Sequence, residues 1–277
     1  MSGARQGLRT PFACWGELAM LPIEVKGKSV LSGSRRFGIP AHIHVCVTAA
    51  GCVILDLRRD KYLGLGREQT EFLADAVPGW PQPVWQRSLC RDRHACSEAE
   101  NATCESLLAD SVLERISEGE EARNVVALRD MRGELISIGD ELEVSGRVTL
   151  GRTVHFLAAC CWARYSLAWR PFSSVVEEVR ARKARAAHGV RAWEIRRLAT
   201  MVDVFRRLRP FVFAAEGHCL LHALALIRFL SGYQLHPEWA IGVTTQPWGA
   251  HSWVQCGNYL LDSNPEKVCG FTPILMV

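Results

Sequence analysis

Hydrophobic and polar residues first alternate clearly after position 40, where the pattern over residues 43–47 predicts a β-strand. Two further β-rich runs joined by a polar turn predict a hairpin over residues 53–65. Apolar positions then recur with helical spacing over residues 67–77, and again over residues 105–116. We therefore expect a short hairpin sheet, one helix after it, and a second helix that closes a small domain.

The segments around these elements carry weaker patterns. Residues 1–38 mix Gly, Ser, Arg and Pro with no sustained period, so we expect them to be disordered. A proline-rich stop opens a predicted loop over residues 78–102. Residues 39–120 then form the first domain. Residues 121–150 form a connector that either contributes short strands or belongs to neither domain.

The second half of the chain is mostly helical at first. Helical spacing predicts three helices, over residues 154–169, 173–187 and 193–208. The segment from Cys219 to residue 230 is apolar on nearly every face, so we expect it to be a buried central helix. With the strands expected after it, this region forms a second domain, residues 151–277. The predicted fold class of the chain is α+β.

Composition excludes several classes of protein. The chain has 277 residues, of which 48% are hydrophobic, and a formal net charge of +4. These values exclude a disordered chain and give no indication of nucleic-acid binding. The basic run 180–185 fits a phosphate contact or a solvated helix face, and the weak net charge favours the solvated face.

Location follows from what the sequence lacks. The most apolar stretch, residues 154–169, carries Arg164 and is shorter than the roughly 20 residues that a membrane span needs, so we expect no membrane association. No secretory signal is recognisable. The eleven cysteines are therefore expected to be reduced thiols of a cytoplasmic protein.

Cys219 is the first candidate for chemistry, because it begins the predicted central helix. At a helix N-terminus, unpaired backbone N–H groups and the positive end of the dipole favour a thiolate and can hold an oxyanion. A cysteine before an apolar helix is more often a core residue, so its position alone does not decide the matter.

A histidine and an aspartate supply the rest of the constellation. If Gly257-Asn258 is a two-residue hairpin turn, Val254 pairs with Leu261, and His251 and Asp262 then share one face of the sheet. The Asp262 carboxylate could in that case orient the His251 imidazole beside Cys219. A three-residue turn would place Asp262 on the opposite face.

A metal site is the weaker alternative. Cys90, His94, Cys96 and Cys104 have a spacing that matches no usual structural zinc pattern, so no metal is expected. No Gly-rich phosphate loop of the Walker type is present, and no bound cofactor is expected.

Four pieces of the C-terminal sequence resemble the transglutaminase-like cysteine peptidase of lasso-peptide biosynthesis, the B protein. They are Cys219-Leu-Leu-His-Ala-Leu-Ala-Leu, Gly242-Val243, Ala250-His251-Ser252-Trp253-Val254 and Leu261-Asp262. The resemblance implies a papain/transglutaminase-like fold with Cys219, His251 and Asp262 as the catalytic triad. It also implies that the protein removes the leader of a ribosomally made precursor before macrocyclisation.

The front of the chain carries a second resemblance. Residues 53–65, Val-Ile-Leu-Asp-Leu-Arg-Arg-Asp-Lys-Tyr-Leu-Gly-Leu, look like the hairpin of the small winged-helix-like domain that recognises the leader. This implies that an extended leader adds as a strand along Lys61, Tyr62, Leu63 and Leu65. The partners implied are the precursor's leader and an asparagine-synthetase-like cyclase, through which any ATP dependence would arise.

Two other functions stay open on the residues. The same triad could transfer an acyl group to an amine, as a true transglutaminase does, because water or an amine can resolve the same thioester. Alternatively, the protein could be a leader-binding adaptor without chemistry, with Cys219, His251 and Asp262 as core residues.

Overall fold

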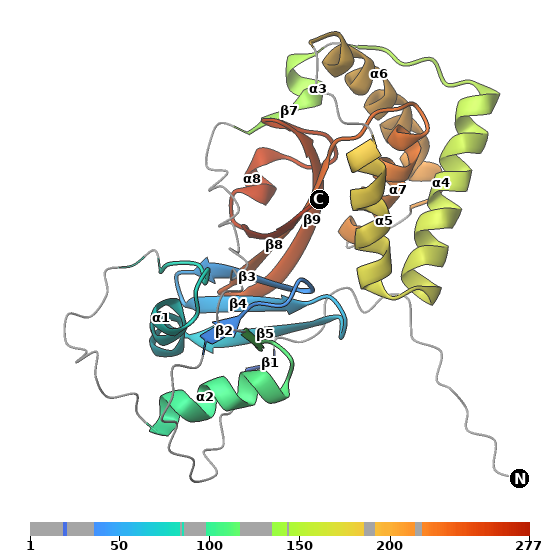
Figure 1. Ribbon diagram of the computed structural model, residues 1–277. Helices are drawn as coiled ribbons and strands as arrows, with labels where there is room; N and C mark the ends of the chain where they lie inside the picture. Colours follow the sequence, from blue (N-terminus) through green and yellow to red (C-terminus); the bar gives the residue numbers. More distant parts are fainter. Residues whose placement is uncertain are drawn as a thin grey trace, which may run out of the picture.

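The computed structural model describes residues 19–20, 36–83, 85, 98–116, 135–142, 144–185, 192–213 and 218–277. Within this part of the chain, a four-stranded sheet and a five-stranded sheet lie next to each other, and most of the helices pack on the five-stranded one (Figure 1). A two-stranded pairing completes the strands.

The N-terminal sheet confirms the predicted strand and hairpin. Strands β3 (Ile43–Thr48), β4 (Gly51–Asp56) and β5 (Lys61–Gly66) pair antiparallel in that order, and α1 (Arg67–Ala76) follows β5 directly. Gly51 has φ +147°, and a Cβ atom there would collide with the backbone oxygen of Leu65. Only glycine fits this position, which sets the tight turn between β3 and β4.

The helix predicted over residues 105–116 is right in its first half and wrong in its second. Helix α2 (Glu98–Ala109) starts earlier, inside the predicted loop, and ends at a turn in which Ser111 has φ 56°. The backbone N–H groups of Val112 and Leu113 then donate to the Leu107 oxygen, which closes the helix. The chain continues as β6 (Glu114–Ile116).

The expectation of disorder over residues 1–38 needs correction at two places. β2 (Arg36–Gly38) pairs antiparallel with β6, and β1 (Ala19–Met20) pairs parallel with β5. Both gain order from backbone hydrogen bonds to distant strands, which a local pattern does not reveal. The rest of that segment lies outside the described residues.

The C-terminal sheet is mixed. Its order is β11-β8-β9-β10-β7, where β8, β9 and β11 are the long strands. The four helices that span residues 150–169, 172–185, 192–208 and 219–231 lie on one side of it, and the short helix of residues 265–268 lies on the other (Figure 1). The strands are β7 (Ile136–Ser137), β8 (Glu238–Thr245), β9 (Trp248–Cys256), β10 (Tyr259–Leu260) and β11 (Thr272–Met276).

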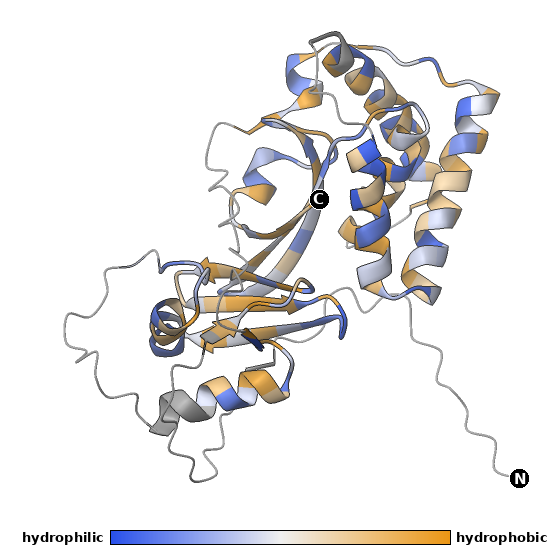
Figure 2. Ribbon diagram, viewed as in Figure 1, coloured by the Kyte–Doolittle hydropathy of each residue, from blue (hydrophilic) through white to orange (hydrophobic). Residues whose placement is uncertain are grey.

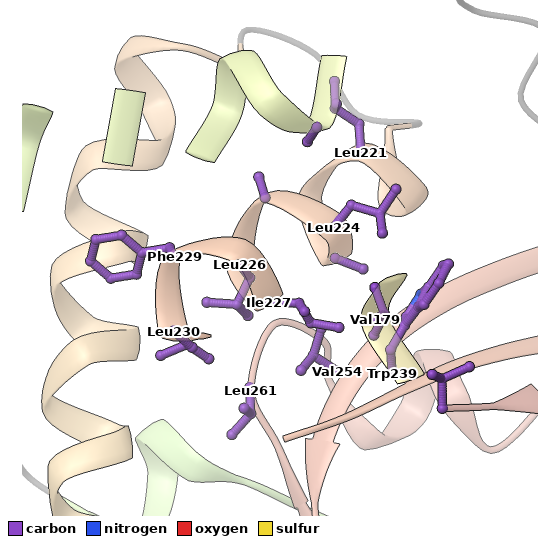
Figure 3. Close-up of a cluster of buried hydrophobic side chains, with 14 of the residues drawn as sticks. Val179, Leu221, Leu224, Leu226, Ile227, Phe229, Leu230, Trp239, Val254 and Leu261 are labelled. Atoms are coloured by element: carbon purple, nitrogen blue, oxygen red, sulfur yellow. The ribbon is translucent and has the colours of Figure 1, made fainter. Parts of the chain in front are cut away.

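All four helices predicted in this half are present. They are α4 (Leu150–Trp169), α5 (Phe172–Arg185), α6 (Ala192–Leu208) and α7 (Cys219–Ser231). The turn η1 (Arg209–Phe211) follows α6 directly, and the short helices α3 (Ile138–Glu141) and α8 (Pro265–Val268) complete the set of described helices in this half. Helix α7 is central: Leu224 and Ile227 point toward β8 and β9 (Figure 3). A helix apolar on nearly every face is stable only where it is covered on all sides, as α7 is.

The two sheets share one hydrophobic core. Val53, Leu55 and Tyr62 of the N-terminal sheet belong to the same buried cluster as α7. The Tyr62 ring packs edge-on against Trp248, with centroids 5.4 Å apart. Residues of the expected connector also join the C-terminal part, because β7 pairs with β10 and the Ile138 side chain is buried in the main core.

The polar surface is consistent with a solvated helix face for the basic run 180–185. Arg182 pairs with Glu178, Arg180 with Glu177, and Lys183 with Glu238. Hydrophilic residues gather on α5, while β3, β4 and β5 are mostly hydrophobic (Figure 2). In the part of the chain that the structure describes, no helix is long and apolar enough to cross a membrane.

Phe229 is expected to be a major contributor to stability. It is fully buried on α7, and its ring contacts those of Phe205 and Tyr233 at 5.7 and 5.2 Å. Phe229→Ala should lower the free energy of unfolding by about 3–5 kcal/mol, measured by urea denaturation. Phe211→Ala is the matched control, because that ring is 86% exposed and its loss should cost almost nothing. Equal losses in the two variants would contradict the position of α7 in the core.

Candidate active site

Cys219 begins α7 and differs from most of the other described cysteines. His218 precedes it as the helix N-cap residue, and the Cys219 side chain is half-buried rather than enclosed. Burial raises the pKa of the thiols of Cys52 and Cys160 to about 12, which leaves them protonated and inert. Cys219 therefore combines a helix N-terminus with access to solvent.

The structure brings the three predicted catalytic residues into the wall of one cavity, with a volume of about 1180 Å³. Cys219 comes from α7, His251 from β9, and Asp262 from the bend after β10. Other lining residues include Asp140, Arg206, Arg209, His218, His222, Ser263, Asn264, Lys267 and Phe271. Residues as far apart in the sequence as Asp140 and Phe271 thus meet around this cavity.

The His251 ring is held in place by aromatic neighbours and one hydroxyl. It stacks on Trp253 with an interplanar angle of 19° and lies 5.3 Å from the Phe271 ring. Gly242 faces His251 on β8, and a Cβ atom there would meet the Trp253 ring at 2.8 Å, so only glycine admits this packing. The Nε2 atom of His251 lies 3.2 Å from the Ser263 hydroxyl oxygen.

The electrostatic surroundings keep His251 neutral. Burial of the ring, followed by the positive charge of Lys267, lowers the pKa of His251 below its ordinary value of 6.5. An imidazole that is unprotonated at neutral pH can accept a proton, which is the requirement for a general base.

The hairpin has the predicted two-residue turn. Tyr259 pairs with Cys256 across Gly257-Asn258, with φ +61° at Gly257, and the Leu261 N–H donates to the Val254 oxygen at 2.9 Å. The ladder ends at Leu260. The chain beyond it bends, so the strand's alternation does not govern the residues that follow.

Asp262 lies in this bend with its carboxylate turned to the backbone. Its Oδ1 accepts the N–H of Val254 at 2.9 Å. Burial of the carboxyl group raises the pKa of Asp262 to about 7, against the hydrogen bonds from backbone N–H groups and the charges of Arg206 and Arg209, which lower it. Among the described residues, no hydrogen bond joins Asp262 to His251.

Ser263 escaped the sequence analysis as a participant, and His222, a poorer candidate than His251 from its place on the helix of Cys219, also lines the cavity. Ser263 contacts the His251 ring directly, as given above. His222 lies one turn after Cys219, with its ring 4.4 Å from that of Phe213, and burial lowers its pKa to about 4. The sequence offers one indication of Ser263, its position directly after Asp262. The hydrophobic pattern gives no reason to choose Ser263 as the partner of His251.

The leader-binding residues expected on β5 lie in three different surroundings. Lys61 is exposed, Leu63 and Leu65 pack in the core of the N-terminal sheet, and Tyr62 lies in the main core. The β5 edge carries β1, with Leu63 opposite Ala19. Burial raises the pKa of the Tyr62 phenol, and the neighbouring acidic groups of Asp60, Cys46 and Cys219 raise it further. The N-terminal sheet therefore reaches the neighbourhood of Cys219.

Three of the four residues of the zinc alternative, Cys90, His94 and Cys96, lie outside the described residues. Cys104 is buried within α2. Over the described ranges, no group of three His, Cys, Asp or Glu side chains could hold a metal ion.

Asp262 should make stability depend on pH. The folded pKa of about 7 exceeds the ordinary value of 3.8, so the unfolded chain loses this proton first as the pH rises. The free energy of unfolding therefore falls between about pH 4 and pH 7, by this group's contribution. Asp262→Asn removes this contribution. The melting temperature of the variant minus that of wild type should therefore be higher at pH 8 than at pH 5, by at least roughly 2–4 °C. A difference between the two proteins that stays constant over this range would contradict the buried carboxyl.

Comparison with known proteins identifies the C-terminal part. Residues 157–276 match the family model of the transglutaminase-like superfamily. No curated protein and no solved structure matches the chain. The part of the chain that carries Cys219, His251 and Asp262 is thus a transglutaminase-like domain, a class whose members are typically cysteine-dependent hydrolases or transferases.

Proposed function

We propose that the protein is a cysteine endopeptidase that binds the leader of a lasso-peptide precursor and cleaves it off before macrocyclisation. The observation that carries this proposal is the shared cavity of Cys219 and His251 within a transglutaminase-like domain. Leader binding is the second half of the proposal, and it is supported by the packing of the N-terminal hairpin against the domain that carries Cys219. An adaptor or a simple hydrolase would not need the hairpin and this domain to be in contact.

The chemistry follows from the two side chains. His251 takes the proton from the Cys219 thiol, and the sulfur attacks the carbonyl carbon of the last leader residue. The oxyanion that forms is stabilised by backbone N–H groups at the start of α7, including that of Cys219. His251 then gives its proton to the leaving amine of the core peptide. Water, deprotonated by His251, hydrolyses the thioester and frees the leader.

Substrate recognition is assigned to the N-terminal sheet. An extended leader would pair with the main chain of β5 along Lys61, Tyr62, Leu63 and Leu65, in the place that Ala19–Met20 occupies. Leu63 and Leu65 are buried under the sheet, so main-chain hydrogen bonds would provide most of the affinity. Tyr62 lies at the junction between this edge and the Cys219 cavity, which gives a short path from the bound leader to the nucleophile.

The proposed partners follow from the product. A core peptide freed at its N-terminus is the substrate for a cyclase that activates a side-chain carboxylate, here an asparagine-synthetase-like enzyme. ATP would be consumed by that partner, while thiol, imidazole and water suffice for the cleavage itself. The reaction is expected in the cytoplasm, where the precursor is made.

The test is mass spectrometry of a synthetic lasso precursor incubated with the protein, with leader affinity measured in parallel by fluorescence anisotropy. Separate leader and core masses are the expected result. Inclusion of a small primary amine distinguishes the second reaction: a leader–amine adduct in place of free leader would identify an acyl transferase. Leader binding without any new mass, with or without the cyclase, would overturn the peptidase and leave an adaptor.

A further inference from the structure

The His251 imidazole has one polar contact that the expected triad does not include. Its Nε2 lies 3.2 Å from the Ser263 hydroxyl oxygen, and Ser263 is 9% exposed. The neighbouring carboxylate of Asp262 is committed to the Val254 N–H at 2.9 Å. The group that touches the imidazole is therefore a hydroxyl, and the carboxylate touches the backbone of the strand.

The direction of the His251–Ser263 hydrogen bond follows from the role of the base. If the Ser263 hydroxyl donated to Nε2, the proton of the neutral ring would be on Nδ1, and neither nitrogen could accept a proton from a thiol. If Nε2–H donates to the Ser263 oxygen, Nδ1 carries the free lone pair. A general base at His251 requires the second arrangement.

Ser263 is fixed on both sides. Before it, Asp262 is tied to β9, and the Leu261 oxygen accepts a hydrogen bond from the Arg206 side chain at 3.0 Å. After it, the Asn264 oxygen accepts the Lys267 and Val268 N–H groups at the start of α8. Because the backbone is held on both sides of Ser263, its hydroxyl has little freedom to move away from the His251 ring. A residue that positions the imidazole must be held in this way.

We propose that Ser263 is the positioning residue of His251, which fixes the Nε2–H tautomer, and that Asp262 acts on the site only through the backbone of β9. This inference rests on the proposed function for its activity readout. It departs from the triad expected from the sequence, in which Asp262 orients the imidazole.

The first experiment compares Ser263→Ala with Asp262→Asn, an exchange that keeps an oxygen to accept the Val254 N–H. Ser263→Ala should lower kcat/KM for precursor cleavage about 3- to 10-fold, the value of one hydrogen bond. Ser263→Thr, which keeps the hydroxyl, should restore most of the loss. Asp262→Asn should stay within about 2-fold of wild type at pH 8. The reverse ranking, with Asp262→Asn the more damaged variant and Ser263→Ala unaffected, would overturn the proposal.

The second experiment needs no substrate, so it separates this inference from the proposed function. The imidazole of His251 is titrated by NMR of ring-labelled histidine, with His251→Ala to assign its signals. Loss of the acceptor in Ser263→Ala should lower the pKa of His251, and the carboxylate of Ser263→Asp should raise it. Asp262→Asn should leave it nearly unchanged. A His251 pKa that responds to Asp262→Asn and not to either Ser263 variant would contradict the assignment, whether or not the protein cleaves a precursor.

Discussion

Cys219→Ala should abolish cleavage of the precursor while leaving leader affinity unchanged. The sulfur is the only atom that forms a covalent bond to the substrate in the proposed mechanism, so its loss should lower kcat by roughly 10⁴- to 10⁶-fold. The fold should survive, because Cys219 lies half-buried at the first position of α7 and is not part of its core. Product masses measured over time, together with fluorescence anisotropy of a labelled leader, check both parts of the prediction.

Cys269→Ala is the matched control for this variant. Cys269 is an exposed thiol in the same domain, directly after α8, and its Sγ lies 3.4 Å from the Glu266 backbone oxygen. Its replacement should leave the cleavage rate at the wild-type value. Cleavage that persists in Cys219→Ala, or that is lost equally in Cys269→Ala, would contradict a nucleophile at position 219.

His251→Ala should have the second largest effect, a fall in kcat/KM of about 10²–10⁴-fold. Without the imidazole, the Cys219 thiol keeps its proton at neutral pH and the leaving amine receives none. Because the pKa of His251 lies below its ordinary 6.5, the wild-type rate should hold down to pH values below 6.5 and then fall as the ring is protonated. A pH–rate profile of both proteins measures this.

His222→Gln provides the comparison for that experiment. This ring also lines the cavity, but burial lowers its pKa to about 4, so it stays neutral over the same pH range. The acidic limb of the wild-type profile should therefore persist in His222→Gln and disappear in His251→Ala. If the acidic limb disappears in His222→Gln, the general base is His222 and not His251.

Much of the site could be predicted, because its parts depend on local sequence. The helix after Cys219 is apolar on nearly every face, and such a segment is stable at the centre of a core. The hairpin register follows from Gly257, which tolerates the positive φ that the first central position of this turn needs. Val254 therefore meets Leu261 as expected.

Ser263 could not be predicted by the same reasoning. The predicted alternation runs through Asp262, whereas the strand ladder ends two residues earlier, at Leu260. Beyond that point the backbone direction is set by tertiary contacts: the Arg206 side chain on the Leu261 oxygen and the start of α8 at Asn264. Neither contact has a local signature in the sequence.

Strands at the front were missed for a similar reason. β2 and β6 have three residues each and pair across a long stretch of sequence, with Phe37 opposite Arg115, 78 positions away. Such short strands have too few residues to show alternation, and long-range pairing decides their conformation. The prediction of a helix over residues 105–116 is wrong after Ala109, where a turn leads into the paired strand β6.

Cys219 is the proposed nucleophile, activated by the His251 base and the start of α7, and its alkylation rate tests this role most directly. Wild-type protein is treated with iodoacetamide at pH 7, and the modified peptides that contain Cys219, Cys161 and Cys269 are quantified by mass spectrometry over time. An ordinary thiol is only a few per cent ionised at this pH. Cys219 should therefore react about tenfold or more faster than the two exposed cysteines, and His251→Ala should remove the advantage. Alkylation of Cys219 at the rate of Cys161 and Cys269, or more slowly, would contradict a catalytic nucleophile.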